Sequence, residues 1–389
     1  MDYELPVGWK WCKQNEVCRL TDGEKKTDVS YPYLEVKYLR GNKEKDFVTS
    51  GKFIKAGTKV ILVDGENSGE VFTVPEDGFM GSTFKALSIQ NVDENYLQFF
   101  IQTKKDLYRN NKKGSAIPHL NKELFFNMPF PLPPTLAEQE RIVNRIETMF
   151  AKLDQAQEKA QSVLDSFETR KAAILHKAFT GQLKIDNEEL TIEDWEETTI
   201  GECCKLGSGG TPSKSHPEYY ENGDIPWLKT GEIDWNDIYD VEEKITNEGV
   251  ENSSAKIFQA ESVVVAMYGM GVTRGKAAII KIPTTTNQAV CVLQPNEKVN
   301  NRFLFYYFMC NYWQIREQSV GGNQLNLSGK IIASFSIKLP PLNYQLSIVN
   351  FLDTVLEKES SAKEAAKTVL DQIALLKKSI LARAFRGEL

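Results

Sequence analysis

The 389-residue sequence is short of the residues that build metal centres and disulfide frameworks. It holds three histidines and six cysteines, and the cysteines form no C-x-x-C pair. This pattern predicts free thiols in a reducing cytosol, and we expect no metal site. No apolar run approaches the roughly 18–20 residues of a membrane-spanning helix, so we expect a soluble, cytoplasmic protein with no membrane partner.

The sequence also lacks an excess of basic charge, since its formal net charge is −6 at pH 7. Residues 1–131 carry 19 basic and 18 acidic side chains, and residues 195–338 carry 13 and 17. Neither region offers a broad basic surface, so any affinity for DNA must come from local clusters or from partner subunits. One such cluster, whose alternative interpretation is a solvated loop surface, comprises Lys104, Lys105, Arg109, Lys112, Lys113 and Lys122.

Complete catalytic motifs are absent as well. Residues 127–130 and 224–227 resemble the Asn/Asp-Pro-Pro-aromatic loop of amino-methyltransferases, but both lack the first proline. Neither follows a Gly-rich strand–turn–helix able to bind S-adenosylmethionine, so we expect a strand end and a tight turn instead. With no histidine-based triad in view, the sequence predicts no catalytic residue.

Residues 269–277 resemble a phosphate-binding loop with the wrong spacing. Five residues separate Gly269 from Gly275 where a P-loop has four, and alanine follows Lys276 where a P-loop has Ser or Thr. Nucleotide hydrolysis is therefore not expected. Thr273, Arg274 and Lys276 on this turn remain candidates for binding a DNA phosphate.

Two long stretches of the chain, by contrast, are near-copies of each other. Residues 132–183 and 339–389 both begin with Leu-Pro-Pro, and they end with Ala-Phe-Thr-Gly-Gln-Leu and Ala-Phe-Arg-Gly-Glu-Leu. Thr135 and Glu138 have capping-box spacing, and Gly181 and Gly387 stand where helix stops are expected. A duplicated helical element predicts a protein with two equivalent working ends.

A heptad pattern continues along both copies, because apolar residues recur at alternating steps of four and three positions. The pattern predicts coiled-coil helices of about 40 residues each. The simplest arrangement pairs the two helices with each other, and the alternative pairs each with a different chain. The predicted seam residues are Ile142, Ile146, Met149, Leu153, Val163, Phe167, Ile348, Leu352, Val355, Val369, Ile373, Leu376 and Ile380.

The regions that precede the helices also match, because residues 9–20 align with 195–206 and residues 114–134 align with 321–341. Short β-rich runs and helical patches predict an α+β fold for each region. Polar, Gly-marked loops hold matching places with exchanged side chains, as expected for readers of different targets. Asn and Gln can pair with adenine, and Arg and Lys with guanine or phosphate. Besides the residues already named, the candidate DNA-binding residues are Ser115, His119, Asn121, Ser208, Thr211, Ser213, Lys214, Lys229, Thr230, Asn323, Gln324 and Asn326.

The chain resembles the DNA-specificity (S) subunit of type I restriction–modification systems over essentially its full length. The resemblance rests on the Leu-Pro-Pro before each helix, on the two helix ends, and on the Gly-Gly-Thr-Pro-Ser and Asp-Ile-Pro-Trp-Leu-Lys-Thr-Gly sequences of the second region. Residues 343–345 read Asn-Tyr-Gln where many relatives have Asn-Glu-Gln, a departure confined to the start of the second helix.

The resemblance implies a protein that does no chemistry and binds no cofactor itself. Each target-recognition domain would read one part of a bipartite double-stranded DNA site, and the coil would set the spacer. Two methyltransferase (modification) subunits would bring S-adenosylmethionine, and restriction/translocase subunits would bring ATP and Mg²⁺.

The implied fold is two globular α+β domains separated by two long helices that form an antiparallel intramolecular coiled coil, in a pseudo-two-fold arrangement. The alternatives are a coiled-coil scaffold that binds proteins but not DNA, and a self-contained DNA methyltransferase. The expected segments are a first recognition domain (1–131), a central helix (132–185), a second recognition domain with a short acidic linker (186–338) and a distal helix (339–389).

Overall fold

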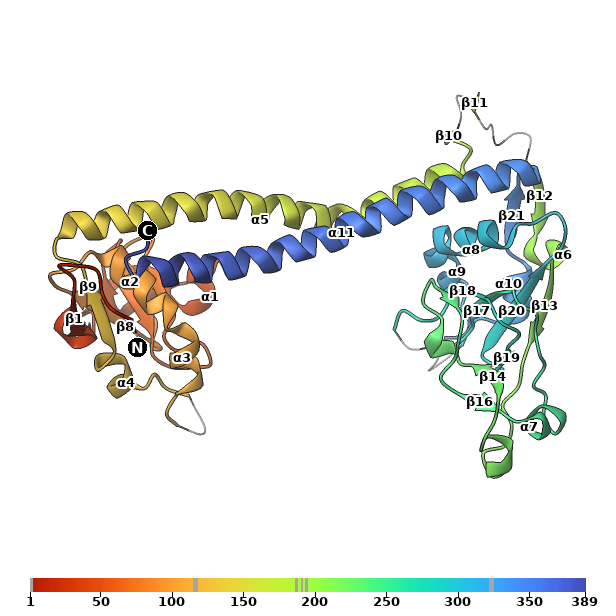
Figure 1. Ribbon diagram of the computed structural model, residues 1–389, viewed down its shortest axis with the longest axis horizontal. Helices are drawn as coiled ribbons and strands as arrows, with labels where there is room; N and C mark the ends of the chain where they lie inside the picture. Colours follow the sequence, from red (N-terminus) through yellow and green to blue (C-terminus); the bar gives the residue numbers. More distant parts are fainter. Residues whose placement is uncertain are drawn as a thin grey trace. The chain divides into compact units, whose positions relative to one another are not determined.

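The computed structural model describes residues 3–114, 118–185, 188–189, 192, 195–269, 271–321 and 325–389. The chain divides into two compact units. The first unit comprises Met1–Ser162 and Ala366–Leu389, and the second comprises Val163–Ala365. Each unit contains one globular region and a part of each of two long helices (Figure 1). Most of the predicted acidic linker lies outside the described residues.

A four-stranded antiparallel sheet in the order β2-β8-β5-β6 forms the centre of the first unit. Its strand β5 is a run of buried residues because the two faces contribute to different cores, Ile61 to one and Val60 and Leu62 to the other. Strands β3, β4 and β7 close into a small barrel. The strands of this unit are β1 (Lys10–Lys13), β2 (Cys18–Thr21), β3 (Glu24–Leu34), β4 (Phe47–Ile54), β5 (Lys59–Leu62), β6 (Val71–Thr73), β7 (Gly78–Met80), β8 (Phe84–Ile89) and β9 (Pro129–Leu132).

Aromatic side chains build the main core of the first unit. Phe100 packs edge-on against Phe130 and Phe385, with ring centroids 4.8 and 5.4 Å apart. Phe385 follows the second long helix, so the end of the chain closes the core of the first globular region. The helices of this region are η1 (Gln14–Glu16), α1 (Val36–Leu39), α2 (Glu94–Thr103), α3 (Lys105–Asn110) and α4 (Lys122–Phe126).

The second unit is built on a five-stranded sheet in the order β13-β20-β17-β18-β15, and a smaller sheet has the order β16-β14-β19. Every residue of β17 and β18 is buried, as their unbroken apolar sequences predict. The strands are β12 (Glu196–Thr199), β13 (Cys204–Ser208), β14 (Ile225–Leu228), β15 (Asp237–Ile238), β16 (Lys244–Ile245), β17 (Val263–Ala266), β18 (Ala277–Ile280), β19 (Thr285–Thr286), β20 (Val290–Pro295) and β21 (Ser336–Leu339). A short hairpin of β10 (Lys184–Ile185) and β11 (Glu188–Glu189) precedes them. The helices are α6 (Ile200–Cys203), η3 (Pro217–Tyr219), η4 (Thr230–Glu232), α7 (Asn247–Glu251), α8 (Asn301–Cys310), α9 (Tyr312–Glu317) and α10 (Gly329–Ala333).

The two globular regions repeat one topology. Strand β1 pairs with β9 in the first and β12 with β21 in the second, and the sheet order β2-β8-β5-β6 has the counterpart β13-β20-β17-β18. Helices α2, α3 and α4 correspond to α8, α9 and α10. The regions differ in the segments inserted between these matched strands, from β2 to β8 in the first region and from β13 to β20 in the second. These segments form the β3-β4-β7 barrel in one region and the β16-β14-β19 sheet in the other. The prediction of two related α+β regions is confirmed.

The long helices are α5 (Leu136–Phe179) and α11 (Leu342–Ala384), and they run side by side in opposite directions (Figure 1). In the first unit Lys377 Nζ lies 2.5 Å from Asp154 Oδ1. In the second unit Arg170 Nη2 lies 2.8 Å from Glu359 Oε2, and Lys363 pairs with Glu168. Residue numbers rise along one helix as they fall along the other, so the helices pair antiparallel and within the chain.

Local signals set the helix ends. The Thr135 hydroxyl accepts a hydrogen bond from the backbone N–H of Glu138, whereas the Glu138 carboxylate pairs with Arg141 and does not complete a capping box. After both helices the chain turns at a glycine with positive φ, 70° at Gly181 and 74° at Gly387. The N–H of the next residue bonds back to the last turn, which is a Schellman stop.

The predicted seam residues of α5 are all buried or half-buried, whereas the prediction is wrong at two positions of α11. Val369 is 38% exposed and Leu376 is 50% exposed. In this part of α11 the residues that face α5 are instead Ala366, Ile373 and the aliphatic stem of Lys377. A lysine takes an inner position because its ammonium reaches Asp154. The remaining seam residues are buried (Ile142, Ile146, Phe167, Ile348, Leu352, Ile373) or half-buried (Met149, Leu153, Val163, Val355, Ile380).

Candidate nucleic-acid interface

In the second unit, two loops meet at one end of the main sheet. The loop between β17 and β18 (residues 267–276) contacts the hairpin of residues 318–327, because Leu327 N–H donates to the Met267 carbonyl at 3.0 Å. The hairpin is closed by Val320 and Asn326, whose backbone groups exchange two hydrogen bonds. We call these two segments the second loop pair. Of the predicted residues in the hairpin, Asn323 and Gln324 lie outside the described residues.

Side chains of helix α9 form hydrogen bonds with the backbone of the β17–β18 loop. Arg316 donates to the Arg274 carbonyl and to the Gly271 carbonyl, both at 2.6 Å, and the Tyr312 hydroxyl donates to the Val272 carbonyl. Arg316 also lies over the Tyr312 ring, 5.3 Å from its centroid. Three loop carbonyls are therefore fixed by two side chains one helical turn apart. Sequence reasoning missed both, although this i, i+4 spacing was a readable signal.

Arg274 is the central cation of the second loop pair. Its Nη1 donates to the Leu325 carbonyl at 2.5 Å. Burial lowers the pKa of the Arg274 guanidinium, and the neighbouring Arg316 lowers it further. An arginine stays protonated in proteins, so this guanidinium, with a second cation beside it, would gain free energy from an anion such as a DNA phosphate.

Unsatisfied polar atoms occur in both loops of this pair. Among the described residues, Arg274 Nε, Ser319 Oγ and Asn326 Oδ1 are buried without a hydrogen-bond partner. Buried polar atoms are normally paired with protein or ordered water, so three such atoms in one loop pair mark these loops as a candidate ligand-binding surface. Exposed Tyr268, Val272 and other apolar side chains of the same loops add surface able to pack against base edges or sugars.

The first unit has an equivalent loop pair, formed by residues 63–70 and 111–120. Lys113 and His119 exchange two backbone hydrogen bonds, as Val320 and Asn326 do, and Leu120 N–H donates to the Val63 carbonyl at 2.7 Å. His119 Nδ1 lies 2.7 Å from Asp64 Oδ1. The matched position of the loops is therefore confirmed, and their side chains differ. Ser115, at the hairpin tip, lies outside the described residues.

The predicted lysines of the first unit lie around this loop pair, mostly in ion pairs. Lys112 Nζ is 2.5 Å from Glu66, Lys113 is 3.3 Å from Glu123, and Lys105 is 3.6 Å from Glu70. Lys104 Nζ instead lies over the Phe100 ring, 5.3 Å from its centroid, and burial lowers the pKa of this ammonium group. Asn121 accepts from Leu124 N–H as the N-cap of α4, so its side-chain oxygen has a structural role.

A third group of predicted residues lies in loops at the same end of the five-stranded sheet of the second unit. Ser208, at the end of β13, pairs with Cys291, which also pairs with Val265 of β17, so the loops after β13 and β17 start from one row. In the loop after β13, Thr211 bonds to Gln288 and Ser213 to Ser215, and Lys214 is exposed. Further along, Lys229 pairs with Glu243 at 2.9 Å and Thr230 begins η4.

The glycines of the loop after β13 serve packing. A Cβ on Gly209 would lie 1.9 Å from the Thr286 carbonyl oxygen, and one on Gly210 would lie 2.0 Å from Ser254 Oγ. Neither glycine is therefore needed to approach a ligand. On the β17–β18 loop, Lys276 pairs with Asp234, while Thr273 packs beside Gly269.

The sequences that resemble methyltransferase motifs are structural. Trp227 lies in β14, is 3% exposed and donates its indole N–H to the Gly210 carbonyl at 2.9 Å. Phe130 lies in β9 and is fully buried. An aromatic ring that stacks on an extruded base must be accessible, so neither ring can do so.

Other sequence expectations concern cysteines, metals and membranes. All six cysteines are free thiols. The part of the chain that the structure describes contains no group of three or more His, Cys, Asp or Glu side chains placed to bind a metal. Each helix in these residues is too short or too polar to cross a membrane.

Known proteins with the same organisation were found by sequence and by structure. The family described as "Type I restriction modification DNA specificity domain" matches residues 6–164 and 192–370. The MjaVIII specificity subunit of a type I restriction enzyme from Methanocaldococcus jannaschii is 26% identical over 421 residues, which cover 99% of this chain and 94% of that protein.

Two solved structures share the fold. The HsdS subunit from Thermoanaerobacter tengcongensis aligns with a TM-score of 0.65 at 19% identity, over 100% of this chain and 99% of that one. A chain from work on complex assembly and conformational transition of the type I R-M system aligns with a TM-score of 0.76 at 19% identity, over 100% of both chains. Two matched specificity domains, each with its own loop pair and long helix, lead to one conclusion: the chain belongs to the type I restriction–modification DNA specificity family.

Proposed function

We propose that this chain is the sequence-reading subunit of a type I restriction–modification complex. Residues 1–131 and 186–338 are the two recognition domains, and each reads one half of a bipartite double-stranded DNA site. The helices of residues 132–185 and 339–389 set the unread spacer. The observation that carries the proposal is the repeated loop pair, in which the backbone framework is kept and the side chains are exchanged.

The energetics favour two weak readers acting together. A good bidentate contact to a base contributes roughly 1–3 kcal/mol, so a few contacts in one domain discriminate poorly. When the readers are joined at a set spacing, their free energies add only on DNA with the matching spacer.

Partner subunits complete the proposal. Two modification subunits bind the chain and supply S-adenosylmethionine and the methyl-transfer chemistry, while restriction/translocase subunits supply the ATP- and Mg²⁺-dependent step. The chain itself binds none of these cofactors. Because neither recognition domain is strongly basic, these partners also neutralise much of the DNA phosphate charge.

Reconstitution tests this function. The purified chain is mixed with the modification subunit of its own system and S-adenosylmethionine, and methylated positions on genomic DNA are read by single-molecule sequencing. We expect one bipartite motif with a single spacer length, and no methylation by either protein alone. Methylation by the isolated chain, or by the modification subunit alone at the same motif, would overturn the proposal.

A domain exchange tests the modular reading. Replacing residues 195–338 with the corresponding region of a relative should change one half-site and leave the other half-site and the spacer as they are. A change in both half-sites would contradict independent reading by the two domains.

A further inference from the structure

Each long helix carries one buried glutamine in its first turn. Gln139 of α5 is 2% exposed and Gln345 of α11 is fully buried. The two glutamines occupy the same place in the duplicated sequence, three residues after the start of the helix. A buried amide in a helix is costly unless it is hydrogen-bonded, so its partners show what it does.

The two glutamines bind equivalent backbone N–H groups, one in each recognition domain. Gln139 Oε1 accepts from the N–H of Asp93 at 2.7 Å, and Gln345 Oε1 accepts from the N–H of Asn300 at 2.9 Å. Asp93 and Asn300 are the N-caps of α2 and α8, and their side chains bond in turn to Tyr96 N–H and Phe303 N–H. Each long helix is therefore hydrogen-bonded to the N-cap residue of a helix in its recognition domain, α2 in the first unit and α8 in the second.

Gln345 uses both ends of its amide. Its Nε2 donates to the Lys298 carbonyl at 2.8 Å and to the Pro340 carbonyl at 2.9 Å. The Tyr306 hydroxyl of α8 also bonds to Asp353 of α11. In the first unit the position equivalent to Tyr306 is Phe99, which packs against Phe150 of α5 with ring centroids 5.8 Å apart. A second contact, polar in one unit and aromatic in the other, thus supports each glutamine.

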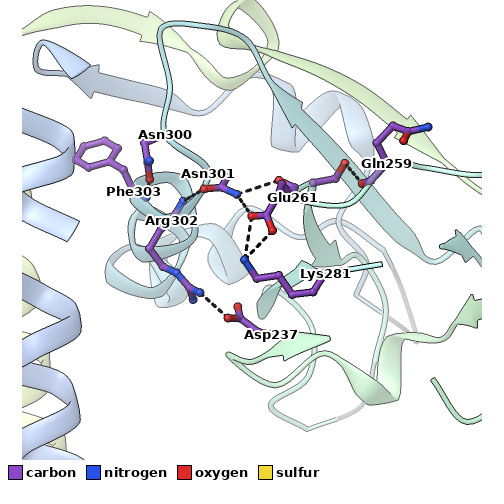
Figure 2. A network of polar contacts seen from close by, with 9 residues as sticks. Asp237, Gln259, Glu261, Lys281, Asn300, Asn301, Arg302 and Phe303 are labelled. Atoms are coloured by element: carbon purple, nitrogen blue, oxygen red, sulfur yellow. Dashed lines mark hydrogen bonds and ion pairs between the residues drawn. The ribbon is translucent and has the colours of Figure 1, made fainter. Parts of the chain in front are cut away.

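In the second unit, polar contacts connect helix α8 to the strands next to the second loop pair. Figure 2 shows Arg302 of α8 reaching Asp237 of β15 at 2.6 Å, and Asn301 reaching Glu261, which Lys281 holds from the other side. Strand β15 pairs with β18, which begins at the end of the β17–β18 loop. The contacts thus join α11 to the strand that follows Arg274.

The first unit makes the same connection with different residues. Asn95, in the position equivalent to Arg302, accepts a hydrogen bond from Lys59 Nζ at 2.7 Å. Lys59 is 7% exposed, also bonds to Thr73, and lies at the start of β5, the strand that leads into the first loop pair. Burial lowers the pKa of its ammonium, which fits a lysine held in place by packing and two neutral acceptors.

We propose that Gln139 and Gln345 are positioning residues, which fix the orientation of each recognition domain on its long helix and thereby restrict the spacer length that the two loop pairs accept. This inference rests on the proposed function and adds to it. Neither glutamine contacts DNA in this view. Their loss affects the spacing of the two half-sites and leaves the bases read within each half-site unchanged.

The test uses substitutions that remove the amide and keep the volume. Gln139→Met and Gln345→Met are compared with Gln155→Met and Gln372→Met, which make the same change at exposed positions of the same helices. Each chain is assembled with its modification subunit and S-adenosylmethionine, and methylates a DNA library with randomised half-sites and varied spacers. Melting temperatures of the free chains are measured in parallel.

We expect the two buried substitutions to leave both half-site sequences unchanged. The preference for the best spacer over spacers one base pair longer or shorter should fall about tenfold, the factor that corresponds to about 1.4 kcal/mol. The exposed substitutions should keep the wild-type preference. A folded Gln345→Met chain with the wild-type spacer preference, or with altered half-site sequences, would overturn the inference.

Hydrogen exchange on the free chain provides a readout that needs no partner. Gln345→Met should speed exchange of the Asn300 amide at least tenfold while amides in β17 keep their rates, because only the former loses its acceptor. If the Asn300 amide exchanges at the wild-type rate in the Gln345→Met chain, the inference is wrong, whether or not the assembled complex is active. If the wild-type complex shows no bipartite motif, the proposed function fails while this measurement still decides whether the glutamine holds the domain.

The carboxylate variants add a comparison between the two sites. Gln139→Glu keeps the oxygen that accepts from Asp93 N–H, near a helix N-terminus that favours negative charge. Gln345→Glu turns a carboxylate oxygen toward two carbonyls in place of an N–H₂ group. Gln345→Glu should therefore relax the spacer preference much more than Gln139→Glu, and the reverse order would contradict the assigned hydrogen bonds.

Discussion

At the residue scale, Arg274 combines a fixed backbone with an unsatisfied side chain. Arg316 and Tyr312 hold the carbonyls of its loop, and its own Nε is buried without a partner in the described structure. The guanidinium is thus preorganised, so that binding a phosphate or a guanine costs little conformational entropy. The same reasoning keeps Asn326, whose Oδ1 has no partner among the described residues, as a proposed DNA contact and makes Asn121 a helix cap, although the sequence presents both as equivalent polar loop residues.

We expect Arg274→Ala to weaken recognition of one half-site only. Loss of a charged contact of about 1–3 kcal/mol should reduce methylation at the cognate site roughly 10- to 100-fold at limiting enzyme, with the other half-site profile unchanged. The exposed Lys330→Ala serves as the matched control. Equal loss in both variants, or altered reading of both half-sites, would show that Arg274 acts only through bulk charge.

Asp22 makes the stability of the first unit depend on pH. Hydrogen bonds from Lys52 and Lys85 lower the pKa of this carboxyl from 3.8 to about 2. A lowered carboxyl pKa stabilises the fold above the usual pKa, and the contribution is lost as the pH falls from about 4 towards 2. The group is largely exposed, so the effect is at most about 1 kcal/mol.

Urea unfolding of the wild type and Asp22→Asn checks this dependence. The wild type should be the more stable at pH 6, and the gap in free energy of unfolding should shrink towards pH 3. Glu44→Gln, which removes an exposed carboxylate of the same unit, should show no such narrowing. A gap for Asp22→Asn that stays constant between the two pH values would rule out the ion pair as its source.

At the scale of elements, the two long helices do not share one regular apolar seam. Apolar side chains dominate the α5 side of the interface, whereas Glu359, Lys363 and Lys377 take places on the α11 side. Their charges reach partners on α5 while their stems cover the seam. This arrangement accounts for the exposure of Val369 and Leu376, and it penalises alternative registers in which these charges would lose their partners.

Substitution of two residues on adjacent turns of α11 tests the corrected seam. Ile373→Lys places a charge at a position that is 4% exposed and should cost about 3 kcal/mol or more in free energy of unfolding. Leu376→Lys, at a 50% exposed position, should change it by less than about 0.5 kcal/mol. Denaturant unfolding measures both. Similar losses in free energy of unfolding for the two variants would instead support the heptad pattern predicted from the sequence.

At the scale of the whole molecule, a paired deletion in the helices tests how the spacer is set. Residues 155–161 of α5 lie opposite residues 370–376 of α11, because Asp154 pairs with Lys377. Removing both segments keeps the helical phase and the flanking ion pairs, and shortens each helix by about 10 Å. With about 3.4 Å per base pair, the preferred spacer should become shorter by about two to three base pairs.

The readout of the paired deletion is again the profile of methylated sites. Both half-site sequences should stay as in the wild type, since the deletion leaves the loop pairs intact. A deletion of residues 155–161 alone should lower stability more than the paired deletion, because it breaks the match between the helices. An unchanged spacer in the paired deletion would contradict the proposed role of the helices.

The features that depend on repetition and local pattern could be predicted from the amino-acid sequence. The duplicated stretches established two equivalent regions, the heptads established the long helices, and glycine and threonine marked their ends. The buried strands β5, β17, β18 and β20 were readable as apolar runs. Strands β3 and β4 were not, because they form a largely exposed ladder whose charged residues carry no regular alternation.

The roles of individual polar residues became apparent only from the folded chain. Gly209 proved to be a packing residue, Trp227 a buried donor, and Arg316 the support of a loop some 40 positions earlier in the chain. Gln139 and Gln345 are ordinary helix residues in the sequence, and their partners lie 46 and 45 positions away. The physical reason is that a polar side chain is defined by the atom it bonds, and folding brings that atom from a distant part of the chain.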